Sequence, residues 1–110
     1  MKILVTGAGG QLGSDVMLLL GRLGIEAVGA DASALDITDR AAVNAFFDRE
    51  RPDGVIHCAA YTNVDLAETE REKCRSVNVG GTANIAAACA ELKEDCSFFK
   101  LFGSYPRVIN

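Results

Sequence analysis

The sequence predicts an α/β domain in which a parallel sheet lies between two layers of helices. Three observations in its 110 residues support this. Short apolar runs rich in branched residues alternate with segments that have the apolar spacing of helices. The run at residues 55–60 is apolar throughout, which is typical of a parallel strand covered on both faces. A glycine-rich turn joins the first apolar run to the first helical segment.

The first 31 residues have the element order of a dinucleotide-binding βαβ unit. Residues 2–6 predict a buried strand, and the glycine-rich segment at residues 7–13 follows at once. A second apolar run, at residues 25–30, predicts another strand and ends in Asp31. Strand, glycine turn, helix, strand and acid follow one another in Rossmann-type domains. We expect the apolar face of the intervening helix at Val16, Leu19, Leu20 and Leu23.

Three of the four glycines in the turn have a physical reason. The tight turn needs unusual backbone angles at Gly7, and a pyrophosphate can approach the backbone only where Gly10 has no side chain. Gly13 lets the helix lie close to the sheet, and the N–H groups at the helix start face the phosphates. The alternative is an ordinary strand-to-helix turn that binds nothing.

Asp31 follows Gly13 by 18 residues, close to the spacing of about 20 at which an acid binds the ribose hydroxyls. A carboxylate there repels a 2′-phosphate, and no arginine occurs in residues 32–38 to offset it. The residues themselves therefore favour NADH over NADPH.

The rest of the chain continues the alternation of helices and strands. Thr38 or Asp39 caps a helix that buries Val43, Phe46 and Phe47, and residues 52–54 form a turn before the strand at 55–60. Residues 68–75 form a solvated helix face. A long helix over residues 77–92 follows, and residues 97–102 can add a further strand. The long helix turns Gly81, Ile85, Ala88, Cys89 and Leu92 toward the sheet, while Asn78 is expected to bond buried backbone.

Composition excludes several classes of protein. The net charge is −4 with no basic run, which argues against nucleic acid, and no apolar stretch approaches the roughly 18 residues of a membrane span. The opening residues are too short an apolar run for a signal peptide. The four cysteines have no metal-ligand spacing, so we expect no metal site and interpret them as reduced thiols of a cytoplasmic protein. His57, within an apolar run, is interpreted as a hydrogen-bonded core residue.

Four motifs resemble those of the dTDP-4-dehydrorhamnose reductase family, within the extended short-chain dehydrogenases/reductases. They lie in the family's order within residues 1–92. They are Thr-Gly-Ala-Gly-Gly-Gln-Leu-Gly at 6–13, Leu-Asp-Ile-Thr-Asp at 35–39, Cys-Ala-Ala-Tyr-Thr-Asn-Val-Asp-Leu-Ala-Glu at 58–68 and Val-Asn-Val-Gly-Gly-Thr-Ala-Asn at 77–84.

The resemblance implies a site for NADH or NADPH. The family places the pyrophosphate along Gly10, Gln11 and Leu12, within the turn that Gly7 and Gly13 shape. It places the adenosine ribose at Asp31 and the adenine at Asp36 and Ile37, where the isoleucine can cover the ring. It places the nicotinamide side of the cleft along Ala59, Ala60, Tyr61 and Thr62. Without the resemblance, Asp36 could instead be a carboxylate that only stabilises a turn, and Thr62 could instead be the N-cap of a helix.

The resemblance ends near residue 92. The family would continue to a Tyr-x-x-x-Lys pair, in which the lysine lowers the pKa of the tyrosine that delivers a proton as hydride arrives. Here Tyr105 is followed four residues later by Ile109, and no catalytic residue is identified. We therefore expect one incomplete Rossmann-type domain over residues 1–110, with four to five strands and no substrate domain, and interpret the change as a truncated or frame-shifted gene end.

Three functions follow as hypotheses. The first is the family's reaction, NAD(P)H-dependent reduction of the nucleotide sugar dTDP-4-dehydro-L-rhamnose to dTDP-L-rhamnose, with this chain catalytically incomplete by itself. The second is a dinucleotide-binding module without turnover. The third is another extended short-chain reductase or epimerase of nucleotide sugars. The oligomeric state cannot be predicted from the sequence.

Overall fold

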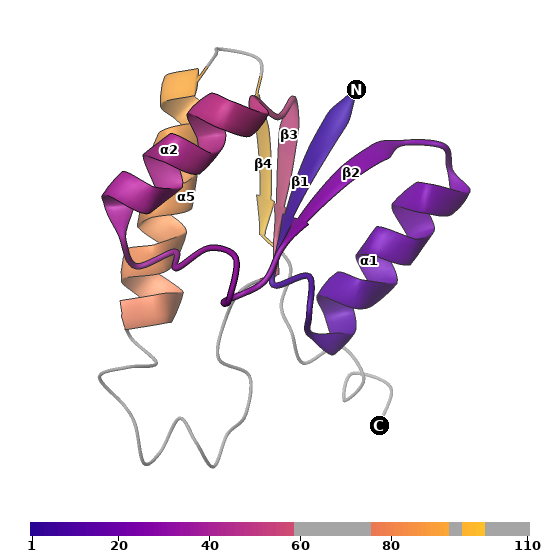
Figure 1. Cartoon of the computed structure of the whole chain (residues 1–110), viewed down its shortest axis with the longest axis horizontal. Coiled ribbons are helices and arrows are strands. Elements are labelled where there is room, and N and C mark those ends of the chain that lie inside the picture. Colours follow the sequence, from indigo (N-terminus) through magenta and orange to yellow (C-terminus); the bar gives the residue numbers. More distant parts are fainter. Residues whose placement is uncertain (59–75, 93–95, 101–110) are drawn as a thin grey trace.

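The computed structural model describes residues 1–58, 76–92 and 96–100. Within this part of the chain four parallel strands form one sheet in the order β2-β1-β3-β4 (Figure 1). In the register of this sheet, Leu4 pairs with Val28 on one side and with Val55 on the other, and Val55 pairs with Phe98. The strands are β1 (Lys2–Thr6), β2 (Glu26–Ala30), β3 (Gly54–His57) and β4 (Ser97–Lys100).

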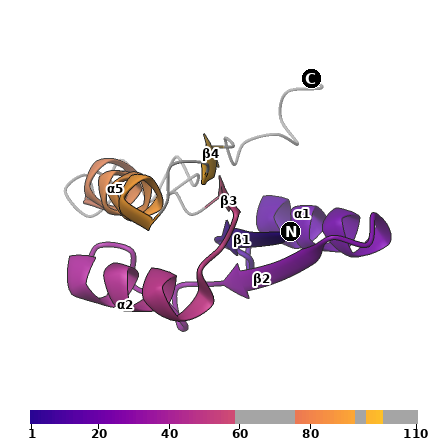
Figure 2. The same ribbon diagram turned by 90° about the horizontal axis from the view of Figure 1, so that it is seen from above.

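Helices cover both faces of this sheet. Helix α1 (Gln11–Arg22) lies on one face, while α2 (Arg40–Glu50) and α5 (Thr82–Leu92) lie together on the other (Figure 2). A π-helical segment, η1 (Ser76–Gly81), leads directly into α5. The three-layer α/β fold predicted from the sequence is therefore confirmed.

Two elements differ in extent from their predictions. The strand expected over residues 55–60 is β3, which begins at Gly54 and ends at His57, and residues 59–60 lie outside the described part. The helix expected over residues 77–92 divides into η1 and α5. The strand expected at 97–102 is present as β4, whose last two expected residues are also not described.

The larger core lies between the sheet and the α2–α5 layer. Apolar side chains of both helices are buried there against Leu4 and Val55 of the sheet. Asp39 is the N-cap of α2, and its carboxylate accepts a hydrogen bond from the Ala42 N–H at 3.2 Å. The predicted cap and helix faces are confirmed, with Val43, Phe46, Phe47, Ile85, Ala88 and Cys89 all buried.

The predicted face of α1 is partly wrong. Leu19 and Leu23 are 55% and 62% exposed, although the sequence placed them in the core. The buried residues of α1 are Gly13 and Leu20, and Val16 and Met17 pack against the same small cluster. These four positions are spaced as one helix face, and Gly13 at the start of that face lies close to the preceding turn.

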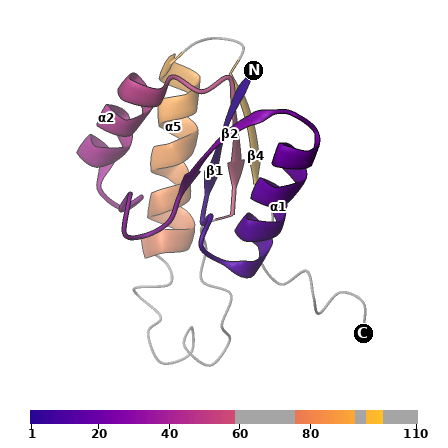
Figure 3. The same cartoon turned by 45° about the vertical axis from the view of Figure 1, so that its right-hand side comes forward.

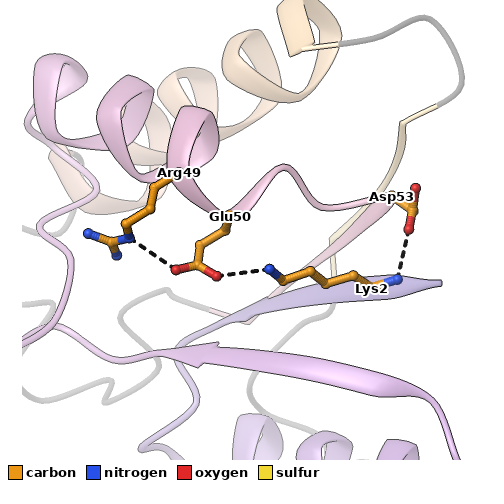
Figure 4. A network of polar contacts seen from close by, with 4 residues as sticks. All are labelled: Lys2, Arg49, Glu50 and Asp53. Carbon is orange, nitrogen blue, oxygen red and sulfur yellow. Dashed lines mark hydrogen bonds and ion pairs between the residues drawn. The ribbon is translucent and has the colours of Figure 1, made fainter.

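A polar network ties the amino-terminal edge of the sheet together (Figure 4). The Lys2 ammonium lies 3.0 Å from a Glu50 carboxylate oxygen, and Arg49 Nε bonds the other oxygen at 3.0 Å. These two cations lower the pKa of Glu50 by hydrogen bonding to its ionised form. The Lys2 N–H also donates to Asp53 Oδ2 at 2.8 Å. The end of α2 and the start of β3 are thereby both attached to β1.

The connections leave a topological switch point between β1 and β3. The chain runs from β1 through α1 to β2 on one side, then crosses through α2 to β3 on the other side of β1. Ligands of open α/β sheets bind outside the carboxyl ends of the strands at such a point. The amino terminus of α1 lies at this same edge (Figure 3).

Candidate functional site

The turn between β1 and α1 is built from glycines for steric reasons. Gly7 has a φ of 67°, in the left-handed region that favours glycine, and its carbonyl accepts the Gly10 N–H at 3.0 Å. A Cβ on Gly13 would lie 2.0 Å from the Gly7 carbonyl oxygen. The fold itself therefore requires glycine at both positions.

Gly10 differs from these two glycines. It is the N-cap of α1, and a Cβ there would lie 3.5 Å from the Gly7 oxygen, an ordinary contact distance. No side chain of the described residues caps the helix, so no side chain there satisfies the N–H groups of its first turn at the end of β1. The packing of the chain does not explain a glycine here, whereas a ligand that approaches the backbone would.

Asp31 lies directly beside this turn. A Cβ on Gly9 would be 3.3 Å from the Asp31 Cβ and 3.5 Å from its Oδ2. The other oxygen, Oδ1, accepts from Ser33 Oγ at 2.7 Å, Ser33 N at 3.1 Å and Ala34 N at 3.0 Å. Hydrogen bonds from Ser33 and Ala34 lower the pKa of Asp31, so the exposed carboxylate is ionised and fixed with Oδ2 toward the turn.

Asp36 repeats this arrangement five residues further on. Its Oδ1 accepts from Thr38 Oγ1 at 2.6 Å and from Thr38 N at 3.0 Å, and these bonds lower the pKa of the exposed Asp36 carboxyl. Both acids thus belong to an Asp-x-Ser/Thr turn in which the residue two positions later fixes one oxygen. Ser33 and Thr38 were not among the predicted site residues, although each stands two positions after an aspartate, the spacing typical of such turns.

Ile37 faces the core rather than the surface. It is 7% exposed, and a Cβ on Gly81 would lie 2.5 Å from its Cδ1. The Ile37 side chain, which the resemblance placed over an adenine ring, is therefore packed mainly against the protein interior. Asn84 Nδ2 donates to the Ile37 carbonyl at 2.9 Å, which fixes the Asp36 turn against α5. The bond to buried backbone inside the sheet that we expected of Asn78 stays a prediction, because the Asn78 side chain is not described.

A buried hydrogen-bond chain lies at the carboxyl ends of β1 and β3. His57 is 1% exposed; its Nδ1 lies 2.7 Å from Thr6 Oγ1 and its Nε2 lies 2.9 Å from Thr82 Oγ1. The Thr6 hydroxyl also accepts the Cys58 N–H at 3.0 Å. The interpretation of His57 as a hydrogen-bonded core residue is confirmed, and the chain joins the switch point to the start of α5.

The structure thus brings one group of predicted site residues together, and another group lies outside the described residues. The glycine turn at residues 7–13 and Asp31 are in contact, and Asp36 lies on the turn that leads into α2. Ala59, Ala60, Tyr61 and Thr62 lie outside the described residues, as do the polar segment at 68–75 and Tyr105. Among the described helices none is long and apolar enough to cross a membrane.

The parallel sheet with its switch point, glycine turn and terminal acid defines a Rossmann-type domain of the dinucleotide-binding kind. The family described as RmlD substrate binding domain matches residues 1–95. The chain belongs to this family, which confirms the resemblance to dTDP-4-dehydrorhamnose reductases.

Known members of the family extend well beyond the length of this chain. A dTDP-4-dehydrorhamnose reductase of Aggregatibacter actinomycetemcomitans is 44% identical over 88 residues, covering 79% of this chain and 30% of the relative. The crystal structure of a dTDP-4-dehydrorhamnose reductase from Clostridium acetobutylicum is 41% identical with a TM-score of 0.80, covering 87% of this chain and 34% of that one. The Bacillus anthracis reductase, solved in complex with NADP, is 37% identical with a TM-score of 0.77 over 83% of this chain and 32% of its own. The chain therefore spans about a third of the length of these relatives.

Proposed function

We propose that this chain binds a nicotinamide dinucleotide at the carboxyl edge of β1 and β2. We further propose that it is the cofactor-binding part of a reductase that converts dTDP-4-dehydro-L-rhamnose to dTDP-L-rhamnose. The observation that carries the proposal is the open backbone at Gly10 beside the oriented Asp31 carboxylate. A Cβ on Gly10 would make only an ordinary contact with the described residues, and the hydrogen bonds on Asp31 Oδ1 leave Oδ2 directed toward the turn.

The described residues fit each part of the cofactor's adenosine diphosphate half. The uncapped first turn of α1, at Gly10, Gln11 and Leu12, offers N–H donors and a positive helix end to the pyrophosphate. Asp31 Oδ2 accepts from the ribose hydroxyls, and Asp36 accepts from the adenine amino group. The bound cofactor supplies the hydride that reduces the sugar carbonyl.

The charge at Asp31 supports a preference for NADH. Its hydrogen bonds with Ser33 and Ala34 favour the ionised carboxylate, which repels a 2′-phosphate, and residues 32–38 contain no arginine. The Bacillus anthracis relative was solved with NADP, so the two cofactors are the natural pair to compare.

A second candidate function is binding without turnover. The observation in its favour is that the residue four positions after Tyr105 is Ile109 rather than a lysine, so these 110 residues contain no Tyr-x-x-x-Lys pair of the family's kind. We propose that the 110-residue chain binds the cofactor but does not reduce the sugar by itself. We also propose a cytoplasmic location, because the cysteines are interpreted as reduced thiols.

Titration of the purified chain with NADH and NADPH, by calorimetry and thermal melting, tests the binding proposal. Saturable binding should raise the free energy of unfolding, by about 2.7 kcal/mol at one hundred times the Kd. Asp31→Asn should weaken NADH binding and reduce the preference over NADPH. Asp48→Asn on the exposed face of α2 is the matched control, because it removes the same charge far from the turn. Gly10→Val should abolish binding by filling the open backbone.

Each possible outcome bears on a different part of the proposal. Absence of binding by a cooperatively folded chain contradicts the dinucleotide site. Tighter binding of NADPH with Asp31 intact contradicts only the cofactor preference. Oxidation of either cofactor in the presence of dTDP-4-dehydro-L-rhamnose, followed by absorbance, would refute catalytic incompleteness and support the complete reaction.

A further inference from the structure

Two cysteine thiols lie unusually close together at the end of α5. Cys89 Sγ is 2.7 Å from Cys96 Sγ, and both residues are free cysteines. Cys89 is buried in the larger core, whereas Cys96, just before β4, is half-buried. The Cys96 thiol also lies 3.6 Å from the Pro52 carbonyl oxygen, and the Cys89 thiol lies 3.5 Å from the Cys96 carbonyl oxygen. The pair therefore joins α5, β4 and the segment before β3.

This pair is remote from the proposed cofactor site. Cys96 precedes the first residue of β4, which pairs with Gly54 at the start of β3. The strands are parallel, so the thiols lie at the amino-terminal edge of the sheet, and the glycine turn lies at the carboxyl-terminal edge. A reaction at the pair needs no residue of the dinucleotide site.

We propose that Cys89 and Cys96 form a reversible intramolecular disulfide when the protein meets a peroxide. A shared metal ion explains the geometry less well, because tetrahedral zinc would hold two thiolate sulfurs about 3.8 Å apart. Among the described residues no group of three or more side chains could complete such a metal site. Disulfides of cytoplasmic proteins are usually transient and respond to oxidants, which fits a pair of thiols already in contact.

The half-buried Cys96 is the thiol that a peroxide reaches first. Its thiolate attacks one peroxide oxygen, which breaks the O–O bond, releases hydroxide and leaves a sulfenic acid on Cys96. The Cys89 sulfur then attacks the Cys96 sulfur. The S–S bond forms as the S–O bond breaks, and the Cys89 proton leaves with the hydroxyl group as water. In total, two thiols and one hydrogen peroxide give one disulfide and two waters.

The environment of Cys89 disfavours its attack on peroxide, while its contact with the Cys96 sulfur places it for the second step. Burial, together with the hydrogen bond to Cys96, raises the pKa of Cys89 to about 12. A thiol in this state is a poor initial nucleophile, because the thiolate is the reactive form. Contact with the Cys96 sulfur removes the need for Cys89 to capture peroxide from solution.

The disulfide would fasten the edge strand of the described sheet. β4 pairs with β3 on one side only, and its Phe99 is 60% exposed. A covalent bond between the start of β4 and the last turn of α5 restricts the unfolded chain and keeps the strand in register. The oxidised protein should therefore melt several degrees above the reduced one.

Non-reducing peptide mapping of the whole chain tests the proposal. The folded protein, shown by a cooperative melt, is treated with hydrogen peroxide, its remaining thiols are alkylated, and it is digested with trypsin. Cleavage after Arg75, Lys93 and Lys100 places the two cysteines in separate peptides, 76–93 and 94–100. We expect these two peptides to be recovered as one linked species that a dithiol reductant separates, and the intact chain to lose about two mass units.

Matched variants decide whether the linkage is specific. Cys96→Ser and Cys89→Ala should each abolish the linked species, while Cys58→Ser, which alters a buried cysteine of the other core cluster, should leave it unchanged. Linkage of either peptide to Cys58 or Cys74 as the main product would overturn the proposal. Dimers linked between chains, or Cys96 oxidised to the sulfinic acid without a linkage, would overturn it equally.

Discussion

Replacing Gly13 by alanine should strongly destabilise the fold, although alanine is normally the better helix residue. The added Cβ would lie 2.0 Å from the Gly7 oxygen, 2.7 Å from the Gly7 carbonyl carbon and 2.9 Å from the Ala8 Cα. All three are backbone atoms, so no flexible side chain can move aside. Ordinary contact begins at 3.4 Å, and the helix start must therefore withdraw by about 1.4 Å from the Gly7 oxygen.

The size of the effect follows from what this withdrawal disturbs. It separates Val16 and Leu20 from the strands they cover, and overpacking of this kind costs about 3 kcal/mol or more when backbone must shift. For a domain of this size the melting temperature should fall by about 12–24 °C. Gly21→Ala in the same helix is the matched control, because a Cβ there meets nothing within 4 Å. That variant should gain about 0.5–1 kcal/mol from helix propensity alone.

Guanidinium unfolding followed by far-ultraviolet circular dichroism measures both variants, since the chain has no tryptophan. The same glycine-to-alanine change should lower the free energy of unfolding at Gly13 and raise it at Gly21. If Gly13→Ala proved as stable as the parent protein, or more stable as Gly21→Ala should be, the close approach of α1 to the Gly7 turn would be refuted.

Three further predictions concern other parts of the described structure. Ser33→Ala should raise the pKa of Asp31 toward its usual 3.8, as measured by NMR titration of the carboxyl group. Because folding lowers this pKa, the ionised Asp31 stabilises the fold above pH 3.8, and this stabilisation is lost as the pH falls through the folded-state pKa. An unmoved pKa would contradict the assigned hydrogen bonds. Arg51→Gly should stabilise the protein by about 0.5–1 kcal/mol in denaturant unfolding, because Arg51 ends α2 with a φ of 47°, and a loss of stability would count against that C-cap. Thr6→Val should cost about 2–4 kcal/mol in the same assay by removing the hydroxyl that bonds His57 and the Cys58 N–H, whereas a near-neutral change would show that this chain of hydrogen bonds contributes little.

Local chemistry was the part of this molecule most open to prediction from sequence. The positive φ of Gly7, the packing role of Gly13 and the Asp39 cap each depend on residues only a few positions away. The element order and the sheet followed from strand and helix periodicity in the same way. The turn geometry, the Gly13 packing and the helix cap could be predicted because neighbours along the chain determine them, whereas the pairing of Leu4 with Val55 joins segments far apart in the sequence.

The rotation of α1, the burial of Ile37 and the partners of His57 were not predicted, because each depends on contacts between distant segments. Periodicity identified α1 as amphipathic but could not fix its rotation, so Leu19 was placed in the core although it is exposed. The burial of Ile37 depends on Gly81, 44 positions further along the chain. His57 was expected to have partners, but Thr6 and Thr82 are 51 and 25 residues away from it. Tertiary packing makes these choices, and spacing along the chain does not encode them.

The two faces of the sheet carry cores of very different size, which has a consequence for motion. Among the residues that the structure describes, eleven buried and five partly buried hydrophobic residues form the cluster on the α2–α5 side, whereas three buried and seven partly buried ones form the cluster on the α1 side. Local opening is easiest where few apolar contacts must be broken, so amide hydrogens of α1 should exchange with solvent sooner than those of α5. The helix that carries the glycine turn is therefore the element most free to adjust to a bound nucleotide. A nucleotide that binds there should slow hydrogen exchange in α1 more than anywhere else in the described fold.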